Sequence, residues 1–267
     1  QSTFTKMPYL RKIWQKNTEE ERLLGVSLTG IMDNYLLSKT ADSKKWLKEL
    51  KAQAIDVNRV YADKLGVPAS AAITCVKPSG TVSQLTDTAS GIHARHSEYY
   101  IRTVRGDNKD PLTQFMKDSG IPAEPCVMKP DSTTVFSFPT KSPSGAVTRN
   151  DMTALEQLEL WKNYALHWCE HKPSVTITVK DAEWMAVGAW VYENFDICSG
   201  ISFLPHSDHS YAQAPYQEID KEQYKELKKQ MPESIDWSAL SLYEKEDTTS
   251  GSQTLACTAG ACELVDI

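Results

Sequence analysis

A Ser-Gly-Thr turn that follows a short apolar run is the first candidate site in this chain of 267 residues. The run covers residues 71–76, and Pro78 leads from it into Ser79, Gly80 and Thr81. A turn of this composition presents successive backbone N–H groups, and its two hydroxyls add further donors, so it can cradle an anion such as phosphate. The spacing of a Walker A loop is absent. A Pro-Ser-Gly sequence also forms ordinary turns that bind nothing, and both interpretations stay open at this point.

Two cysteines near the C-terminus form the second candidate site. Cys257 and Cys262 stand five positions apart in a segment of small polar residues. Two accessible thiols at this spacing can close a disulfide loop and reopen it by thiol–disulfide exchange, and we favour this redox role. The alternatives are half of a zinc site and two incidental thiols. Zinc usually takes cysteines two to four residues apart with a second pair of ligands, so we expect no metal here.

Histidines supply two weaker candidates. His93 and His96 flank Arg95 soon after the Ser-Gly-Thr turn, and together they would make a cationic neighbourhood that suits a phosphorylated ligand. The alternative is that these histidines are bonded to the backbone of their own loop. His167 and His171 have the spacing of neighbours on a helix, where surface residues are commoner than metal ligands.

Helical and strand patterns alternate along the chain and must position these residues. The pattern predicts helices at 41–65, 152–171 (with Asp151 as the N-cap) and 181–194, and strands at 23–31, 71–76, 99–105, 133–139, 174–179 and 201–205. Such alternation indicates an α/β architecture with a largely parallel sheet or barrel. From about residue 240 the chain is small, polar and without periodicity, so we expect a folded part at 1–240 and a flexible tail at 241–267.

Composition excludes several classes of protein. The chain is 40% hydrophobic and 24% charged, which is typical of globular proteins. Its 29 basic and 35 acidic residues give a net charge of −6, which argues against a broad face for nucleic acid. No apolar run reaches the roughly 18 residues of a membrane span, and no leader opens the chain, so we expect no membrane partner and a cytoplasmic location. Six cysteines are too few for a disulfide scaffold.

Several segments in one order give the chain a specific resemblance. It is similar to the C-terminal half of adenosylcobalamin-dependent (class II) ribonucleotide reductases, in particular the monomeric triphosphate type. The similarity covers nearly the whole chain. The segments that carry it are 15–17 with 24–31, 76–83, 90–93, 99–105, 202–205, 213–216 and the terminal pair Cys257 and Cys262.

The resemblance implies a fold and a role for both candidate sites. The family fold is a ten-stranded α/β barrel of two five-stranded halves, and this chain would form the second half with a flexible C-terminal tail. Pro78, Ser79, Gly80 and Thr81 would hold the phosphates of a ribonucleoside triphosphate. Cys257 and Cys262 would reduce the active-site disulfide after each turnover and would be recharged by thioredoxin or a similar dithiol donor.

The resemblance also implies adenosylcobalamin as the cofactor and thiyl-radical reduction of ribonucleotides, the reaction that supplies deoxyribonucleotides for DNA replication. This sequence departs from the family at one point, because the Asn-Pro-Cys-x-Glu loop that carries the radical cysteine is absent. The residues that contact cobalamin cannot be placed. We therefore expect an N-terminal reductase half, as a separate chain or a missing segment, and no reductase activity without it.

Three other interpretations stay open. The chain could be a fragment of a class I reductase large subunit, which shares the barrel. It could be a docking module without catalysis, although an intact Cys257 and Cys262 pair argues against that role. It could also be a small thiol-redox or metal-binding protein built around the tail.

Overall fold

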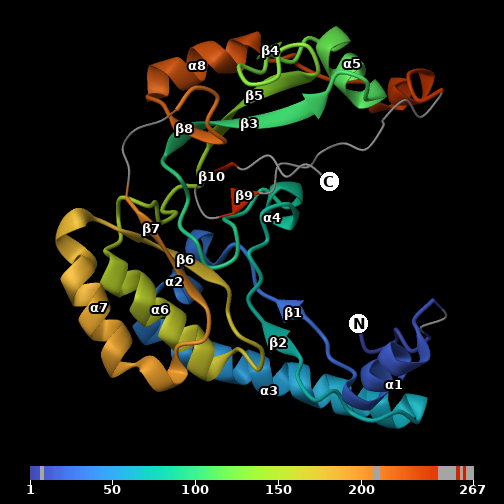
Figure 1. Cartoon of the computed structure of the whole chain (residues 1–267), viewed down its shortest axis with the longest axis vertical. Coiled ribbons are helices and arrows are strands. Elements are labelled where there is room, and N and C mark those ends of the chain that lie inside the picture. The colour runs from blue at the N-terminus through green and yellow to red at the C-terminus, as the bar shows by residue number, and fades with distance from the viewer. Residues whose placement is uncertain (7–8, 207–210, 246–256, 259–260, 263–267) are drawn as a thin grey trace. The chain divides into compact units, whose positions relative to one another are not determined.

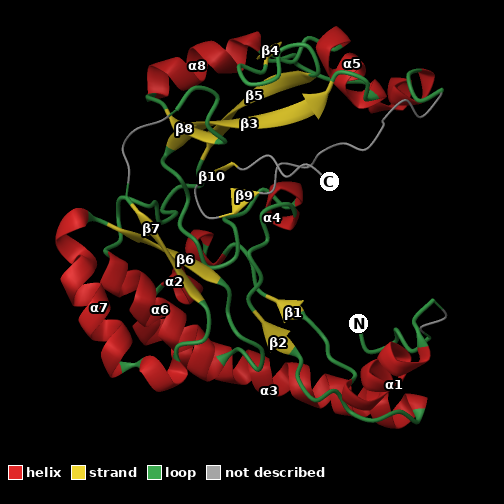
Figure 2. Ribbon diagram, viewed as in Figure 1, coloured by secondary structure: helices red, strands yellow, loops and turns green. Residues whose placement is uncertain are grey.

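Two units, each with its own strands, make up the mixed α/β chain in a computed structural model (Figures 1 and 2). The first unit holds residues 1–95 and 144–206, and the second holds residues 96–143 and 207–267. The structure describes residues 1–6, 9–206, 211–245, 257–258 and 261–262. The boundary expected near residue 240 stays a prediction, because residues 246–256 of the expected tail lie outside the described ones.

The first unit contains two pairs of parallel strands and most of the helices. Strand β1 pairs with β2, and β6 pairs with β7 over five residues. The bounds are α1 Lys12–Glu21, β1 Val26–Ser27, η1 Ile31–Asp33, α2 Tyr35–Ser38, α3 Thr40–Leu65, β2 Thr74–Cys75, α4 Val82–Leu85, α6 Ala154–His167, β6 Val175–Val179, η2 Asp181–Glu183, α7 Trp184–Glu193, η3 Phe195–Ile197 and β7 Ile201–Pro205.

Helices α3 and α6 pack together and enclose the core of this unit. Leu158, Trp161 and Tyr164 recur at a spacing of three residues on α6 and are fully buried. Strand β6 is buried at every second residue, as a strand with one face on the core must be. The periodicity that predicted this helix and this strand is therefore confirmed.

The start of α6 differs from the prediction by two residues. Thr153 is the N-cap, and its hydroxyl accepts a hydrogen bond from the N–H of Glu156 while the Glu156 carboxylate accepts one from the N–H of Thr153. Asp151 does not cap the helix, because its carboxylate accepts hydrogen bonds from the N–H and the hydroxyl of Thr148. Thr153 and Glu156 have the capping-box spacing, which was the signal to follow.

The end of α6 also differs, since the helix stops at His167 and not at His171. Beyond it, the backbone turns to β2. The Trp168 carbonyl accepts a hydrogen bond from the Thr74 hydroxyl, and the Trp168 indole donates one to the Cys75 carbonyl. His171 donates its backbone N–H to the Thr74 carbonyl. His167 and His171 therefore do not share a helix face.

The second unit contains an antiparallel sheet of four strands in the order β4-β5-β3-β8. Helix α8 packs on β3 and β5, and the rings of Tyr99 and Tyr224 lie 5.2 Å apart across that contact. The bounds are β3 Tyr99–Asp107, α5 Pro111–Asp118, β4 Ala123–Pro125, β5 Thr133–Lys141, β8 Tyr216–Glu218, α8 Lys221–Gln230, η4 Trp237–Leu242, β9 Cys257–Thr258 and β10 Ala261–Cys262.

The expectation of a largely parallel sheet is wrong for this second unit. Strands β4 and β5 are joined by a short connection, which antiparallel neighbours allow and parallel ones do not. Strand composition alone does not carry strand direction. The predicted strand at 23–31 is also shorter than expected, because Gly30 adopts φ +71° and the chain then turns into η1.

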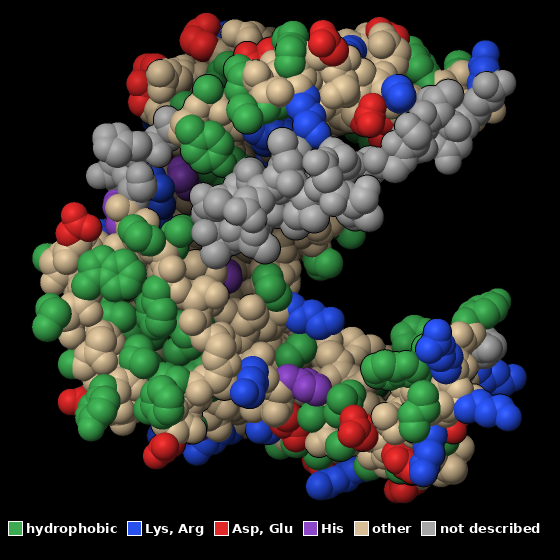
Figure 3. All heavy atoms as spheres, in the orientation of Figure 1, with side chains coloured by type: hydrophobic (Ala, Val, Ile, Leu, Met, Phe, Trp, Pro, Cys, Tyr) green, Lys and Arg blue, Asp and Glu red, His purple; other side chains and the backbone are tan. Residues whose placement is uncertain are grey.

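Helix α7 carries no charged residue between its ends, and several of its apolar side chains are exposed. Met185, Tyr192 and Phe195 just beyond it are each more than 70% exposed. Figure 3 shows hydrophobic side chains gathered over the region of α6 and α7. Such a surface is typical of a helix that another polypeptide covers.

Among the described residues, no helix has the length and apolar character needed to cross a membrane.

Candidate functional site

The Ser-Gly-Thr turn leaves the carboxyl end of β2 and runs into α4. Cys75 and Val76 are buried, whereas Pro78, Gly80 and Thr81 are exposed. Ser79 adopts φ +54°, the left-handed region that residues other than glycine seldom enter, and Thr81 is right-handed helical. Alternation between left- and right-handed residues turns successive N–H groups toward one side, the backbone arrangement that binds anions.

The amides of this turn find no hydrogen-bond acceptor in the part of the chain that the structure describes. Among the described residues, no acceptor lies within hydrogen-bond distance of the N–H groups of Ser79, Gly80, Thr81 or Val82. The pairing resumes directly afterwards, where the N–H of Ser83 donates to the Ser79 carbonyl. We call residues Ser79–Val82 the amide cradle. The Thr81 hydroxyl is exposed beside it, and the Ser79 hydroxyl donates only a long hydrogen bond of 3.3 Å to the Lys77 carbonyl.

Residues 87–95, which contact the start of the cradle through Gly91, are held by buried polar contacts. The Arg95 guanidinium donates two hydrogen bonds to the Asp33 carboxylate at 2.8 and 2.9 Å, and the Arg95 side chain is 5% exposed. Gly91 lies against the Lys77 carbonyl. These residues are far apart in the sequence, and no spacing rule could have joined them. Gly91 was noted only as part of a resemblance.

The first of the two interpretations of this loop, a cationic neighbourhood made by His93, Arg95 and His96, is wrong. His93 is neutral, because its Nε2 accepts the Thr176 N–H at 3.0 Å and burial lowers its pKa. Arg95 is neutralised by Asp33. His96 belongs to the second unit, where its ring stacks on Tyr216 at 5.6 Å. The alternative interpretation, loop histidines bonded to the backbone, is confirmed for His93, whose Nδ1 contacts the Ser90 carbonyl.

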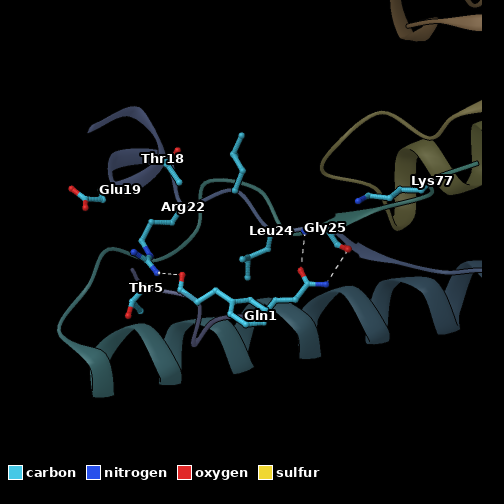
Figure 4. A pocket seen from close by; sticks show the side chains of 10 residues that line it. Gln1, Thr5, Thr18, Glu19, Arg22, Leu24, Gly25 and Lys77 are labelled. Carbon is cyan, nitrogen blue, oxygen red and sulfur yellow. Dashed lines mark hydrogen bonds between the residues drawn. The ribbon is translucent and has the colours of Figure 1, made fainter. Parts of the chain in front are cut away.

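A cavity of about 380 Å³ lies beside Lys77, the residue that leads into the cradle (Figure 4). The Gln1 side-chain amide closes one side of it through two hydrogen bonds with the backbone of Gly25. Arg22 and Lys77 bring positive charge to it and Glu19 brings negative charge. The lining is completed by Phe4, Thr5, Thr18, Leu23 and Leu24.

The backbones of Cys257 and Cys262 lie opposite one another. Both residues are register partners in the antiparallel pair of β9 and β10. Directly opposite residues in such a pair have Cα atoms about 4.5–5.5 Å apart, within the range of about 4.4–6.8 Å that a disulfide spans. The predicted tether that carries them falls mainly on residues 246–256, which lie outside the described residues.

The other four cysteines are free thiols and are not paired with one another. Burial raises the pKa of Cys75, and it raises that of Cys169 to about 12. Cys75 is 5% exposed on β2 and is therefore a core residue. Cys126 differs: burial raises its pKa, but hydrogen bonds from the amides of Met128 and Lys129, together with a hydrogen bond from Arg105 and its positive charge, outweigh that effect and lower it. Sequence reasoning gave Cys126 no role.

Among the described residues, no group of three or more histidine, cysteine, aspartate or glutamate side chains is placed to hold a metal ion. His171 is engaged elsewhere, since its Nε2 lies 2.7 Å from the Leu24 carbonyl.

Comparison with known proteins identifies relatives over nearly the whole chain. The adenosylcobalamin-dependent ribonucleoside-triphosphate reductase of Euglena gracilis is 30% identical over 259 residues, which cover 93% of this chain and 35% of the relative. A probable reductase of the same name from Dictyostelium discoideum is 28% identical and covers 98% of this chain and 34% of the relative. The reductase of Lactobacillus leichmannii is 27% identical over 290 residues. No family model matches the chain.

A solved structure shares the fold. The crystal structure of a B-12 dependent (class II) ribonucleotide reductase superposes with a TM-score of 0.79 at 24% identity, covering 91% of this chain and 38% of that one. The mixed α/β fold is therefore common to both. The chain is similar to adenosylcobalamin-dependent ribonucleoside-triphosphate reductases over nearly its whole length, and it spans about a third of the length of the curated relatives it matches.

Proposed function

We propose that this chain is the C-terminal part of a ribonucleotide reductase that converts ribonucleoside triphosphates to deoxyribonucleotides. In this proposal it supplies the phosphate-binding loop and the terminal dithiol. The observation that carries the proposal is the amide cradle, a row of backbone donors that no described residue accepts, within the segment 76–83 where the resemblance to the reductases is most specific. Relatives named as ribonucleoside-triphosphate reductases over more than nine tenths of the chain support it.

The cradle suits a triphosphate for physical reasons. Phosphate oxygens are strong acceptors with negative charge, and fixed N–H dipoles bind them without a lysine or arginine in direct contact. Gly80 has no side chain, and a Cβ there would meet no atom of the described residues within 4 Å, so none of these residues blocks the approach to the backbone. Lys77 is exposed beside the cradle and adds positive charge to its surroundings.

The dithiol would carry electrons to the active site. Cys257 and Cys262 give two electrons and two protons to an active-site disulfide by thiol–disulfide exchange, and their own sulfurs then form a disulfide. Thioredoxin or a similar dithiol donor reduces this disulfide and is itself oxidised. The opposed backbones of the two cysteines support the proposal, since directly opposite residues of an antiparallel pair have a Cα separation that a disulfide can span.

The remainder of the reductase would complete the barrel. Parallel strands occur in sheets that are covered on both faces, and a sheet of two strands is marginal by itself. Two separate parallel pairs, β1 with β2 and β6 with β7, support a half-barrel that is completed by an N-terminal reductase half. The exposed apolar face of α7 supports a covering polypeptide as well. That half would also bring the radical cysteine, which this chain lacks.

Adenosylcobalamin would be the cofactor of the assembled enzyme, since the relatives are named for it. When bound, it supplies the radical that starts the reaction. The cavities of about 380 and 80 Å³ in the first unit are too small to enclose a corrinoid, so neither fits the cofactor as it stands. We therefore place no cobalamin contact on residues of this chain.

Reductase activity with and without the missing half tests the proposal. The assay contains adenosylcobalamin, a ribonucleoside triphosphate and dithiothreitol, and the second polypeptide is the one encoded immediately upstream. We expect deoxyribonucleotide only when both polypeptides are present. Product from this chain alone would contradict the half-enzyme account, because one of its own cysteines would have to carry the radical. No product in either mixture would favour the docking module.

Serine variants of the two terminal cysteines separate a redox role from a structural one. In the assembled enzyme, Cys257→Ser or Cys262→Ser should abolish multiple turnover with thioredoxin, because the relay between thioredoxin and the active site is broken. Turnover with dithiothreitol should persist, since a small dithiol reaches the active-site disulfide directly. Cys198→Ser is the matched control and should leave both activities unchanged. Equal loss with both reductants would contradict the relay.

A further inference from the structure

We propose that Gly91 and Thr29 are positioning residues that set the shape of the amide cradle. This inference rests on the proposed function of the cradle as a phosphate site. It concerns residues that touch no ligand themselves and that act through the backbone of Lys77 and Pro78.

Gly91 supports the entrance of the cradle by direct contact. Its backbone has φ +55°, and a Cβ built on it would lie 2.5 Å from the Lys77 carbonyl oxygen and 3.5 Å from that of Pro78. Both are backbone atoms, so they cannot turn aside as the end of a flexible side chain can. Any side chain at position 91 must therefore push the Lys77–Pro78 peptide, and with it the amides that follow.

Thr29 holds Gly91 in this place. The Thr29 hydroxyl accepts a hydrogen bond from the Gly91 N–H at 3.0 Å and donates one to the Ala89 carbonyl at 3.1 Å. The N–H of Gly30 donates to the same Ala89 carbonyl at 2.9 Å. One hydroxyl thus joins two residues of the supporting segment to the backbone that follows β1.

The same segment also holds the far side of the cradle. The Ser83 and Ser90 hydroxyls lie 2.9 Å apart, and the N–H of Thr88 donates to the Ser83 carbonyl at 2.9 Å. Ser83 is fully buried at the first turn of α4. Contacts from residues 88–91 therefore fix both ends of the cradle, at Lys77 before it and at Ser83 after it.

A buried ion pair anchors this supporting segment at its own two ends. The Asp33 carboxylate accepts the Arg95 guanidinium and also the Ala89 N–H, the latter at 2.7 Å. Arg95 donates a further hydrogen bond to the Asp87 carbonyl at 2.8 Å. Residues 87–95 are thus closed into a loop on η1. A loop held in this way transmits a change at Gly91 to the cradle, because it has little freedom to absorb the change elsewhere.

The test compares two glycines that share a conformation but not a neighbour. Gly66 has φ +65° at the end of α3, and a Cβ there would meet no described atom within 4 Å. Gly91→Ala and Gly66→Ala therefore carry the same left-handed strain, whereas only the first presses on the cradle. Binding of inorganic tripolyphosphate to the full chain is measured by calorimetry, well below the unfolding temperatures of wild type and both variants.

We expect Gly91→Ala to bind tripolyphosphate about tenfold more weakly than wild type, through hydrogen bonds to a charged group that no longer align. Gly66→Ala should bind like wild type even if both variants unfold at a lower temperature. Wild-type affinity in a folded Gly91→Ala would overturn the positioning role and leave the phosphate site intact. A wild-type chain that does not bind tripolyphosphate would overturn the phosphate site itself, and the positioning role with it.

A second pair of variants covers the case in which Gly91→Ala does not fold. Thr29→Val keeps the shape of the side chain and loses its hydroxyl, whereas Thr29→Ser keeps the hydroxyl. We expect about fivefold weaker binding for Thr29→Val, the equivalent of one neutral hydrogen bond, and wild-type binding for Thr29→Ser. Equal affinities for the two variants would contradict a role through the hydroxyl.

Discussion

Two of the turns that hold a non-glycine residue in the left-handed region, those at Ser79 and Gln213, use it in opposite ways. At Ser79 in the first unit, φ is +54° and the amides that follow have no acceptor among the described residues. At Gln213 in the second unit, φ is +58° and the side-chain oxygen and nitrogen of the residue are both hydrogen-bonded. Ser79 leads into an exposed turn, whereas Gln213 is 7% exposed.

The pairing of Gln213 explains its backbone conformation. Its side-chain oxygen accepts the Val127 N–H, its side-chain nitrogen donates to Glu124 and to the Pro125 carbonyl, and its own carbonyl accepts from Arg105. Here the strain of the backbone is offset by hydrogen bonds within the protein. Among the described residues, no hydrogen bond to the amides of the cradle offsets the strain at Ser79 in the same way. A left-handed residue therefore points to a binding site only where the backbone N–H groups next to it have no acceptor among the described residues.

The largest effect should come from removing the hydrogen-bonded side chain of Gln213. Gln213→Ala removes a side chain that accepts a hydrogen bond from the Val127 N–H and donates to Glu124 and to the Pro125 carbonyl, and we expect a loss of about 2–3 kcal/mol in the stability of the second unit. Gln217→Ala removes a side chain with a single long hydrogen bond of 3.4 Å and is the control. Hydrogen exchange of the β3 and β5 amides measures the difference. Tripolyphosphate binding should not change, and a change in it would break the contrast between the two turns.

A smaller effect is expected at the open turn, and on binding instead of stability. Thr81→Val removes an exposed hydroxyl without changing the shape of the side chain, so tripolyphosphate affinity should fall about fivefold, the equivalent of one hydrogen bond of about 1 kcal/mol. The unfolding temperature should stay the same. Thr86→Val is the control, because the Thr86 hydroxyl is already bonded to the Val82 carbonyl. Unchanged affinity in Thr81→Val would limit the cradle to its amides.

The smallest effect concerns pH and the neutral His93. Burial lowers its pKa below the value of about 6.5 that it has in an unfolded chain, so below that pH the unfolded state binds a proton that the folded state does not. The stability that depends on neutral His93 is therefore fully present above about pH 6.5 and is lost as pH falls.

Urea unfolding of wild type and His93→Gln between pH 7.5 and 5.5 measures this dependence. The stability of wild type should fall more steeply with decreasing pH than that of the variant, which has no group to protonate at this position. His171→Gln, at a histidine bonded to a different carbonyl, serves as the comparison. Parallel pH profiles for wild type and His93→Gln would contradict a neutral His93 in the folded chain.

The sequence predicts most elements of the fold, because helices and strands follow from local periodicity. Residues 154–167 and 175–179 show this well. Periodicity does not show in which direction a strand runs or which strand it pairs with. The antiparallel sheet of the second unit is the clearest case. The cap of α6 was misplaced because Asp151 and Thr153 are both good caps, and only the Glu156 side chain decides between them.

In the candidate site, too, the features that depend on neighbours in sequence were predicted and those that depend on distant residues were not. The composition of the turn at Pro78–Thr81 predicts open backbone donors, because they depend on neighbours in sequence. The residues behind it could not be predicted. Asp33 and Arg95 are 62 positions apart, and Gly91 meets Lys77 only in the folded chain. Arg95 was expected to face a ligand for the same reason, since an arginine beside histidines gives no sign of a buried carboxylate partner.

The most direct test of the phosphate-site account is a titration of the ¹⁵N-labelled chain with inorganic tripolyphosphate, followed through its amide resonances. The account predicts that the N–H signals of Gly80, Thr81 and Val82 move progressively and to saturation. The signal of the paired Val127 amide should stay in place. Signals of the cradle that do not move, with or without movement elsewhere, would contradict the claim that this turn holds a substrate's phosphates.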